Sequence, residues 1–576
     1  MLAEARLLSA EKTWSPESLH ALREWLQACT TSHRACIPSS TSHRLPLRLL
    51  DVCQGSGLVS GQYPPGMDNF DRFSAAQQPS VRLCSTRGLP PNTHYVTLSY
   101  RWAESPRLLL TKKTESRFEQ GMDLGALPPE DVAIFRDAIH VTRCLGFRYI
   151  WIDALCIKQD DEEEKGTEIM NMGDIYGNCI LNISASEGVA DANGLVYKRD
   201  LLLANPCRYV DSGQSDAGPS AVFGEALRLS GSGLSQRGWV FQERTLAPRI
   251  VHFTRHHLLF ECGQRFCPEW RCDTGGSSAE TSPYSAVKDL LAVRSDQGPE
   301  RNEVPSEATH RFEELWYRHI VPLYSTTKIS FHSDRLLALS AVAQRYCAAR
   351  KLQTPDYVAG VWKPDLPAAL LWRHNVDVSG PVYDSLSLAP SWSWASSSGE
   401  AWGIVPHRLD AKASVVSVHA EPMSRNPFDG TRSCVLRLQG RLWKFCRRED
   451  GNKTRWYNPA NAHALSEVAS CPVPGQNEVG IVWDRTTSAT KALFLKFQPP
   501  NQMITAGIGR PALYFLHVAN SQGFEEGLVL HPRDGALGGY VRVGFWMLEK
   551  GLCVPGELER HEFVEGICGQ YVIDIY

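Results

Sequence analysis

Three short apolar segments, residues 95–100, 149–156 and 179–184, restrict the fold of this chain more than any other feature. They are rich in β-branched and aromatic residues, and their charges lie almost entirely at their ends. Such segments suit strands that are buried on both faces, as in a parallel sheet. Two amphipathic helical patterns, at 131–145 and about 162–176, separate them, so the order predicts a right-handed parallel α/β unit.

Polar side chains gather where each of these predicted strands ends. Ligands of open α/β sheets bind outside the carboxyl ends of the strands. A small-molecule site is therefore expected among these residues: Ser99, Tyr100, Arg101 and Trp102 after the first strand, Asp153, Cys156 and Gln159 after the second, and Ser184, Ser186 and Glu187 after the third.

Four motifs occur in a fixed order: LSYRW at 98–102, YIWIDALCIKQ at 149–159, MGDIY at 172–176 and RGWVFQER at 237–244. Together they resemble the heterokaryon incompatibility (HET) domain of filamentous fungi and cover about a quarter of the chain. Segments 324–342, 357–372, 390–395 and 527–544 resemble the usual later part of such proteins. The family more often has a small residue or Cys followed by Trp-Gly where this chain has Arg101-Trp102-Ala103, which puts any role of Arg101 in doubt.

The resemblance implies an effector of non-self recognition and programmed cell death, a form of fungal innate immunity. HET domains are similar to TIR domains in their proposed flavodoxin-like topology, and some TIR domains cleave the nicotinamide–ribose bond of NAD with a glutamate near a strand end. On that analogy NAD is a possible substrate, no cofactor is otherwise implied, and Asp153, Glu187 or Glu243 would supply the acid. Recruitment of the HET fold to a specialised biosynthetic or regulatory pathway is the alternative.

The residue types by themselves do not decide whether Asp153 and Glu243 are catalytic or structural. Asp153 could act as an acid or base, or accept a hydrogen bond from a ribose hydroxyl, but an amide cap or a pair with Arg101 or Arg244 is favoured. Glu243 could likewise present a carboxylate to the site, although a structural pair with Arg244 is favoured.

The other candidates would bind rather than react. Cys156 is interpreted as a buried thiol, because no histidine base is obviously near it. The predicted binding residues are Ser99, Tyr100, Arg101, Trp102, Cys156, Gln159 and Arg244.

Two groups of cysteines and histidines raise the question of a metal. Cys29, His33 and Cys36, with a later Cys53, could hold a structural zinc ion. Cys262, Cys267 and Cys272 recur near His256 and His257. Neither group has a paired Cys-x2-Cys knuckle, so local residues and buried thiols are favoured and no metal ligand is predicted.

A chain of 576 residues is expected to form two to four domains. The predicted parts are an N-terminal helix with flanking strands (1–90), the HET core (91–272), a linker and helical region (273–390) and a β-rich region (391–576). The fold class is therefore α/β, with a flavodoxin- or TIR-like parallel sheet, a helical middle segment and a β-rich C-terminal region.

Charge and hydropathy limit the classes of partner and the cellular compartment that we expect for this chain. A net charge of −3 gives no electrostatic argument for nucleic acid. No apolar run approaches the roughly 20 residues of a membrane span, and the 17 scattered cysteines suit reduced thiols. We expect a cytoplasmic protein that acts through a protein partner or through self-association.

Overall fold

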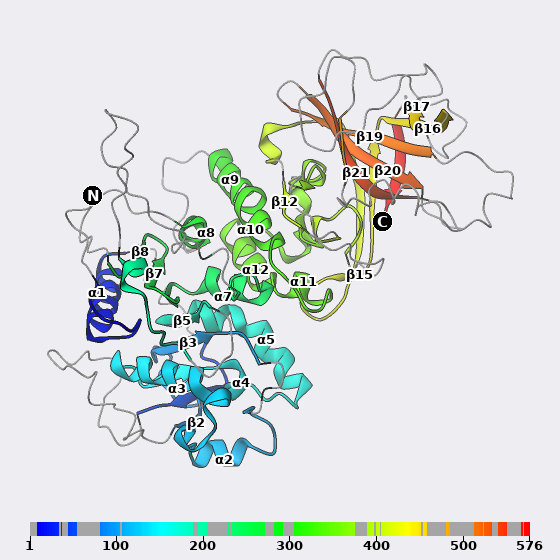
Figure 1. Cartoon of the computed structure of the whole chain (residues 1–576). Coiled ribbons are helices and arrows are strands. Elements are labelled where there is room, and N and C mark those ends of the chain that lie inside the picture. Colours follow the sequence, from blue (N-terminus) through cyan, green and yellow to red (C-terminus); the bar gives the residue numbers. More distant parts are fainter. Residues whose placement is uncertain are drawn as a thin grey trace, which may run out of the picture. The chain divides into compact units, whose positions relative to one another are not determined.

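The computed structural model describes residues 8–33, 36, 44–53, 81–103, 106, 108–187, 194–205, 229, 233–270, 282–291, 305–374, 389–396, 399–403, 405–450, 453–457, 480–483, 512–521, 524–532, 539–549, 566–567 and 570–576. It divides into two compact units, Met1–Gln297 and Gly298–Tyr576. Figure 1 shows the helices and strands along the chain.

The first unit is built on an eight-stranded sheet with the order β2-β1-β4-β3-β5-β6-β7-β8. Its strands are β1 (Arg48–Asp51), β2 (Arg82–Ser85), β3 (Tyr95–Ser99), β4 (Tyr149–Trp151), β5 (Leu181–Ala185), β6 (Arg249–Phe253), β7 (Leu258–Cys262) and β8 (Phe266–Pro268). The four central strands, β4-β3-β5-β6, run parallel. The expected alignment of the three apolar segments is therefore confirmed. Both margins of the sheet are antiparallel, so the sheet as a whole is mixed.

The helices between the parallel strands begin and end close to their predicted residues. Pro129 lies in the first turn of α3 (Pro129–Cys144), and Gly146 follows its end with a φ of 83°. The side chain of Asp161 accepts a hydrogen bond from the Glu164 amide and so caps α5 (Glu162–Gly177). Both ends follow from local residue chemistry, because proline suits a first helical turn and glycine adopts positive φ without steric cost.

The second apolar segment is shorter as a strand than predicted. β4 ends at Trp151, and Asp153–Cys156 forms the short helix α4. The Cys156 amide donates to the Ile152 carbonyl over 2.8 Å, a helical rather than a strand pairing. The prediction of a strand through Cys156 was wrong because a buried apolar run of this length does not distinguish strand from helix.

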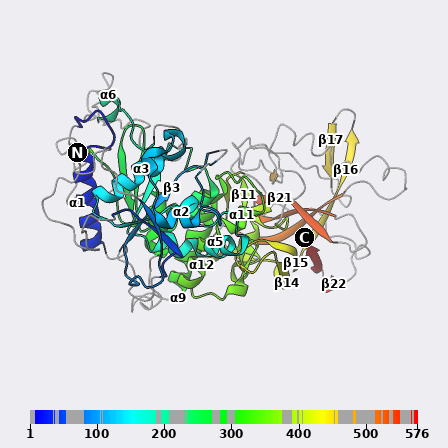
Figure 2. The same cartoon turned by 90° about the horizontal axis from the view of Figure 1, so that it is seen from below.

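The other helices of the first unit are α1 (Pro16–Ser32), α2 (Glu115–Gln120), η4 (Leu124–Ala126), α6 (Leu201–Ala204), α7 (Gly238–Leu246) and α8 (Pro283–Leu291). Helix α1 lies beside β7 (Figure 1), and Figure 2 shows it at the margin of the same unit from a second direction. Trp25 of α1 stacks on Phe260 of β7 with 5.6 Å between ring centroids, which joins the helix to this edge of the sheet.

The second unit begins with helices. They are α9 (Pro305–Glu314), the π-helical η7 (Leu315–Ile320), α10 (Val321–Ser325), α11 (Asp334–Leu337) and α12 (Ser340–Ala349). Short 3-10 turns follow: η8 (Thr354–Asp356), η9 (Lys363–Asp365), η10 (Ala368–Leu370), η11 (Trp394–Ser396) and η12 (Pro406–Arg408). Two small pairs of strands accompany them, β9 (Tyr357–Val358) with β10 (Val361–Trp362), and β11 (Arg373–His374) with β12 (Ala401–Trp402).

Aromatic side chains form the core of this helical part. Tyr346 lies 4.8 Å from Trp316 and 4.9 Å from Trp362 between ring centroids, and both tryptophans are fully buried. These tryptophans therefore serve packing.

A mainly antiparallel sheet of eleven strands completes the second unit, as the β-rich sequence predicted. Its strands are β13 (Asp410–Ala411), β14 (Ser414–Pro422), β15 (Thr431–Gly440), β16 (Leu442–Asp450), β17 (Lys453–Tyr457), β18 (Gly480–Trp483), β19 (Ala512–Asn520), β20 (Phe524–Pro532), β21 (Tyr540–Glu549), β22 (Gly566–Ile567) and β23 (Gln570–Ile575). Among the residues described above, no helix has the length and apolar character needed to cross a membrane.

Candidate functional site

Side chains from separate segments of the first unit meet at the carboxyl ends of β3 and β4. Ser99 is the last residue of β3, Asp153 begins α4 just after β4, and Glu243 lies in α7. Tyr176 of α5 hydrogen bonds with Glu243. Two of the three predicted acids therefore lie close enough to influence one another's ionisation at this edge of the sheet.

Asp153 is held by neutral donors rather than by an arginine. The Trp102 indole donates to its Oδ2 over 2.7 Å, and the Ala154 amide donates to its Oδ1 over 2.7 Å. The Tyr100 hydroxyl also hydrogen bonds with it. Burial raises the pKa of Asp153, whereas these donors favour the charged form and act in the opposite direction.

Glu243 is the second carboxyl group with a raised pKa. Its side chain is only 8% exposed. Burial raises the pKa of Glu243 to about 7, and the negative charge of Asp153 adds to the shift, while the hydroxyls of Ser99 and Tyr176 oppose it. A carboxyl group with such a pKa is present in both protonation states at neutral pH, as a general acid or base requires.

A chain of hydrogen bonds orients the Glu243 carboxylate. Thr97 Oγ1 donates to Asn182 Oδ1 over 3.0 Å, and Asn182 Nδ2 donates to Ser99 Oγ over 2.9 Å. Ser99 Oγ in turn donates to Glu243 Oε2. Every member of the chain is buried, so the position of the carboxylate depends on the alignment of β3 with β5.

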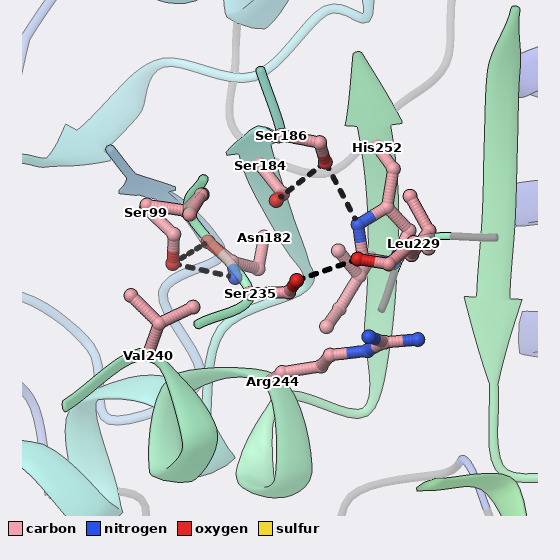
Figure 3. A pocket seen from close by; sticks show the side chains of 11 residues that line it. Ser99, Asn182, Ser184, Ser186, Leu229, Ser235, Val240, Arg244 and His252 are labelled. Carbon is pink, nitrogen blue, oxygen red and sulfur yellow. Dashed lines mark hydrogen bonds between the residues drawn. The ribbon is translucent and has the colours of Figure 1, made fainter. Parts of the chain in front are cut away.

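A narrow pocket opens beside this chain, between the ends of β3, β5 and β6 (Figure 3). Ser99 and Asn182 line one wall, and Ser184, Ser186 and His252 line another. Leu229, Leu234, Ser235, Val240, Arg244 and Ile250 complete the lining. The pocket combines a few oriented polar groups with apolar walls, and its volume of about 10 Å³ corresponds to about one water molecule.

Arg244 lines the wall of this pocket and pairs with Glu261 rather than with Asp153 or Glu243. Its Nη2 donates to Glu261 Oε2 over 2.6 Å, and the same oxygen lies 3.2 Å from His252 Nε2. Both the pair and the histidine are buried. The expected pairing of Arg244 with Asp153 or Glu243 was wrong, because α7 directs residues 243 and 244 toward different neighbours.

Burial and neighbouring charges together set the ionisation of the residues along this wall. Burial lowers the pKa of His252 to about 4, despite the opposing hydrogen bond with Glu261. His252 is therefore neutral at neutral pH, and its Nδ1 lies 3.2 Å from Ser186 Oγ. Arg244 and His252 hold the pKa of Glu261 well below its usual range against the opposing effect of burial.

The remaining predicted residues lie apart from the carboxylates or support them indirectly. Glu187 accepts a hydrogen bond from the Arg255 amide over 2.7 Å, and Arg101 is exposed. Burial raises the pKa of the Cys156 thiol, which agrees with an unreactive buried thiol. Gln159 donates through Nε2 to the Asp153 carbonyl over 3.2 Å and so supports the backbone at that acid.

The sequence patterns did not single out Asn182, Tyr176, His252 or Glu261. A usable signal was present for all four. Tyr176 ends the MGDIY motif at 172–176. Asn182, His252 and Glu261 are polar residues inside strands that are otherwise buried, and a buried polar side chain requires a partner.

The structure regroups the cysteines and histidines that the sequence analysis considered as metal ligands. Cys262 lies with Cys29, His33 and Cys36. Cys53 Sγ contacts the Phe147 carbonyl at 3.5 Å and is not a member of that cluster. Cys267 lies on β8, and Cys272 falls outside the described residues.

Comparison with known proteins agrees with the motifs. Residues 95–243 match the family model described as heterokaryon incompatibility protein (HET). A protein named heterokaryon incompatibility protein 6, OR allele, from Neurospora crassa is 31% identical over 98 residues, which cover 16% of this chain and 14% of that protein. The match thus spans only a small part of the relative. No solved structure matches the chain significantly. The motifs and the family match together identify residues 95–243 as a HET domain of the fungal heterokaryon incompatibility type.

Proposed function

We propose that this chain is an incompatibility-type effector of fungal non-self recognition, which causes cell death by cleaving the nicotinamide–ribose bond of NAD at the end of β3. The observation that carries the proposal is Glu243, a buried carboxyl group with a pKa of about 7 beside a pocket. The name of the similar Neurospora crassa protein supports the biological role.

The strand order supports a flavodoxin- or TIR-like relationship. Numbered along the chain, the four parallel strands lie in the order 2-1-3-4, which corresponds to the flavodoxin-like order. In that arrangement the ligand crevice lies where the strand order reverses, here between β3 and β5. The pocket lined by Ser99, Asn182 and Ser184 lies at this point.

The proposed reaction is hydrolysis. The bond between ribose C1′ and the nicotinamide nitrogen breaks, and its electron pair leaves with nicotinamide. The oxygen of water bonds to C1′, and one proton of that water passes to the Glu243 carboxylate and then to solvent. Ser99 and Tyr176 position the carboxylate, and burial, with a smaller contribution from Asp153, raises its pKa enough for it to accept a proton at neutral pH.

The test is NAD turnover by the purified full chain. Glu243→Gln keeps the size of the side chain but cannot accept the proton, so kcat should fall by about 10²- to 10⁴-fold. The matched control is Glu187→Gln, which changes a predicted acid that bonds to the Arg255 amide instead. Equal NAD consumption by wild type and Glu243→Gln, or no consumption by the activated wild type, would contradict the enzymatic proposal.

Expression in a fungal host tests the cellular role with the same variants. We expect cell death with the wild type and with Glu187→Gln, and survival with Glu243→Gln. Death with a folded Glu243→Gln protein would favour the alternative, in which the domain signals by self-association or by binding a partner.

A further inference from the structure

A compact group of three thiols and one imidazole contains none of the residues of the carboxylate site. Cys29 is on α1, His33 follows the end of that helix, Cys36 lies just beyond, and Cys262 ends β7. The four potential ligand atoms all lie within 4.8 Å of one another, and His33 Nδ1 is 3.4 Å from Cys262 Sγ.

These separations suit a tetrahedral zinc ion. Zinc binds cysteine sulfur at about 2.3 Å and histidine nitrogen at about 2.0–2.1 Å. Ligand atoms on such a tetrahedron are about 3.5–3.8 Å apart, so shifts of an ångström or less in side-chain position complete the geometry. Each side chain is at most 8% exposed, which leaves no open coordination position of the kind a catalytic zinc keeps for water.

A buried positive charge beside the cluster also favours a bound metal ion. Arg249 is fully buried, and its Nε donates to Cys29 Sγ over 3.2 Å. Its Nη2 donates to the Cys36 carbonyl over 2.6 Å. Its Nη1 donates to the Ile180 carbonyl over 3.3 Å, so the partners of this guanidinium among the described residues are one sulfur and two carbonyl oxygens, and none is a carboxylate. A buried charge without a counter-charge is costly.

A zinc ion with three thiolates and one neutral imidazole carries a net charge of −1. Arg249 would balance it and would also donate a hydrogen bond to a ligand sulfur, as groups around metal ligands commonly do. A disulfide between two of the cysteines would remove two potential thiolates and so would not balance the charge of the guanidinium. The cluster and the arginine are therefore explained together by one metal ion.

We propose that Cys29, His33, Cys36 and Cys262 bind a structural zinc ion that fastens the end of α1 to β7. The site joins residues more than 220 positions apart in the chain, and it draws no residue from the carboxylate cluster. Zinc would stabilise the first unit without taking part in the reaction proposed for Glu243.

The experiment measures metal in the full chain purified under reducing conditions. We expect one zinc ion per chain by elemental mass spectrometry, and substitution with Co²⁺ should give the thiolate charge-transfer and d–d absorption of a tetrahedral site. Cys262→Ser should lose most of the metal. Cys267→Ser, which changes a buried thiol on the neighbouring strand β8, should retain it.

A second measurement does not depend on the folding of any variant. A strong chelator should lower the melting temperature of the wild type, and added zinc should restore it. Failure of the reduced wild type to take up zinc, a Co²⁺ spectrum without thiolate bands, or equal metal loss from Cys267→Ser and Cys262→Ser would each overturn the proposal. This experiment does not measure NAD turnover, so the zinc proposal and the catalytic proposal for Glu243 can be refuted independently.

Discussion

Glu243 shows how burial and its immediate neighbours set the chemistry of one side chain. Ser99, Tyr176 and Asp153 all influence its carboxyl group, and only the first two favour ionisation. At a position 8% exposed the penalty on the charged form prevails. The same feature that suits the residue to proton transfer therefore makes it a source of instability above its usual pKa.

The raised pKa predicts a pH dependence of stability. A carboxyl group with a higher pKa in the folded state favours folding while protonated, and that contribution is lost as pH rises from 4.5 to about 7. Across this range, urea unfolding should show the Glu243→Gln variant gaining up to about 3 kcal/mol relative to wild type. Tyr176→Phe removes a hydroxyl that lowers the pKa of Glu243, so in that variant the loss of stability should extend to higher pH and become larger in total. Parallel stability curves for wild type and Glu243→Gln would contradict this account.

At the scale of single elements, helix ends were the easiest features to predict. Proline at the start of α3 and acids at the start of α5 act within one turn, so they are readable from adjacent residues. The boundary between β4 and α4 was not readable in this way, because both parts of the segment are apolar and buried. Whether the residues after Trp151 form strand or helix depends on which backbone partners the sheet offers them.

Helix α1 provides a test of such local chemistry. Ser15 Oγ accepts a hydrogen bond from the Ser18 amide over 3.2 Å at the start of the helix. Ser15→Ala should therefore lower the free energy of unfolding by about 1 kcal/mol. The control Ser32→Ala makes the same change at the exposed end of the helix and should alter it by less than about 0.5 kcal/mol. The comparison uses chemical denaturation, and equal losses for both variants would contradict a capping role.

At the scale of the whole chain, two units have separate sheets and separate cores. The sequence predicted four parts, and those four boundaries stay a prediction. The expectation that the strands before the HET core flank the central sheet is confirmed, because β1 pairs with β2 and with β4 in the same sheet as β3. The direction and register of that pairing join residues about 100 positions apart, and local patterns do not specify them.

Separate cores predict separate unfolding. Calorimetry of the full chain should show two transitions, and a fragment of residues 1–297 should reproduce one of them with a mixed α/β circular dichroism spectrum. A single cooperative transition, together with an unfolded fragment, would show that each unit depends on the other.

The sequence by itself determined the three apolar strands, the helices between them, the β-rich second half and the edge of the sheet where Asp153 and Glu243 meet. These follow from periodicity, end residues and the rule that parallel strands share one carboxyl edge. Only the tertiary structure decided that Glu243 contacts Ser99 while Arg244 pairs with Glu261, and that Cys262 rather than Cys53 joins Cys29, His33 and Cys36. Such partners are chosen by strand order and packing, which bring together residues that no local pattern connects.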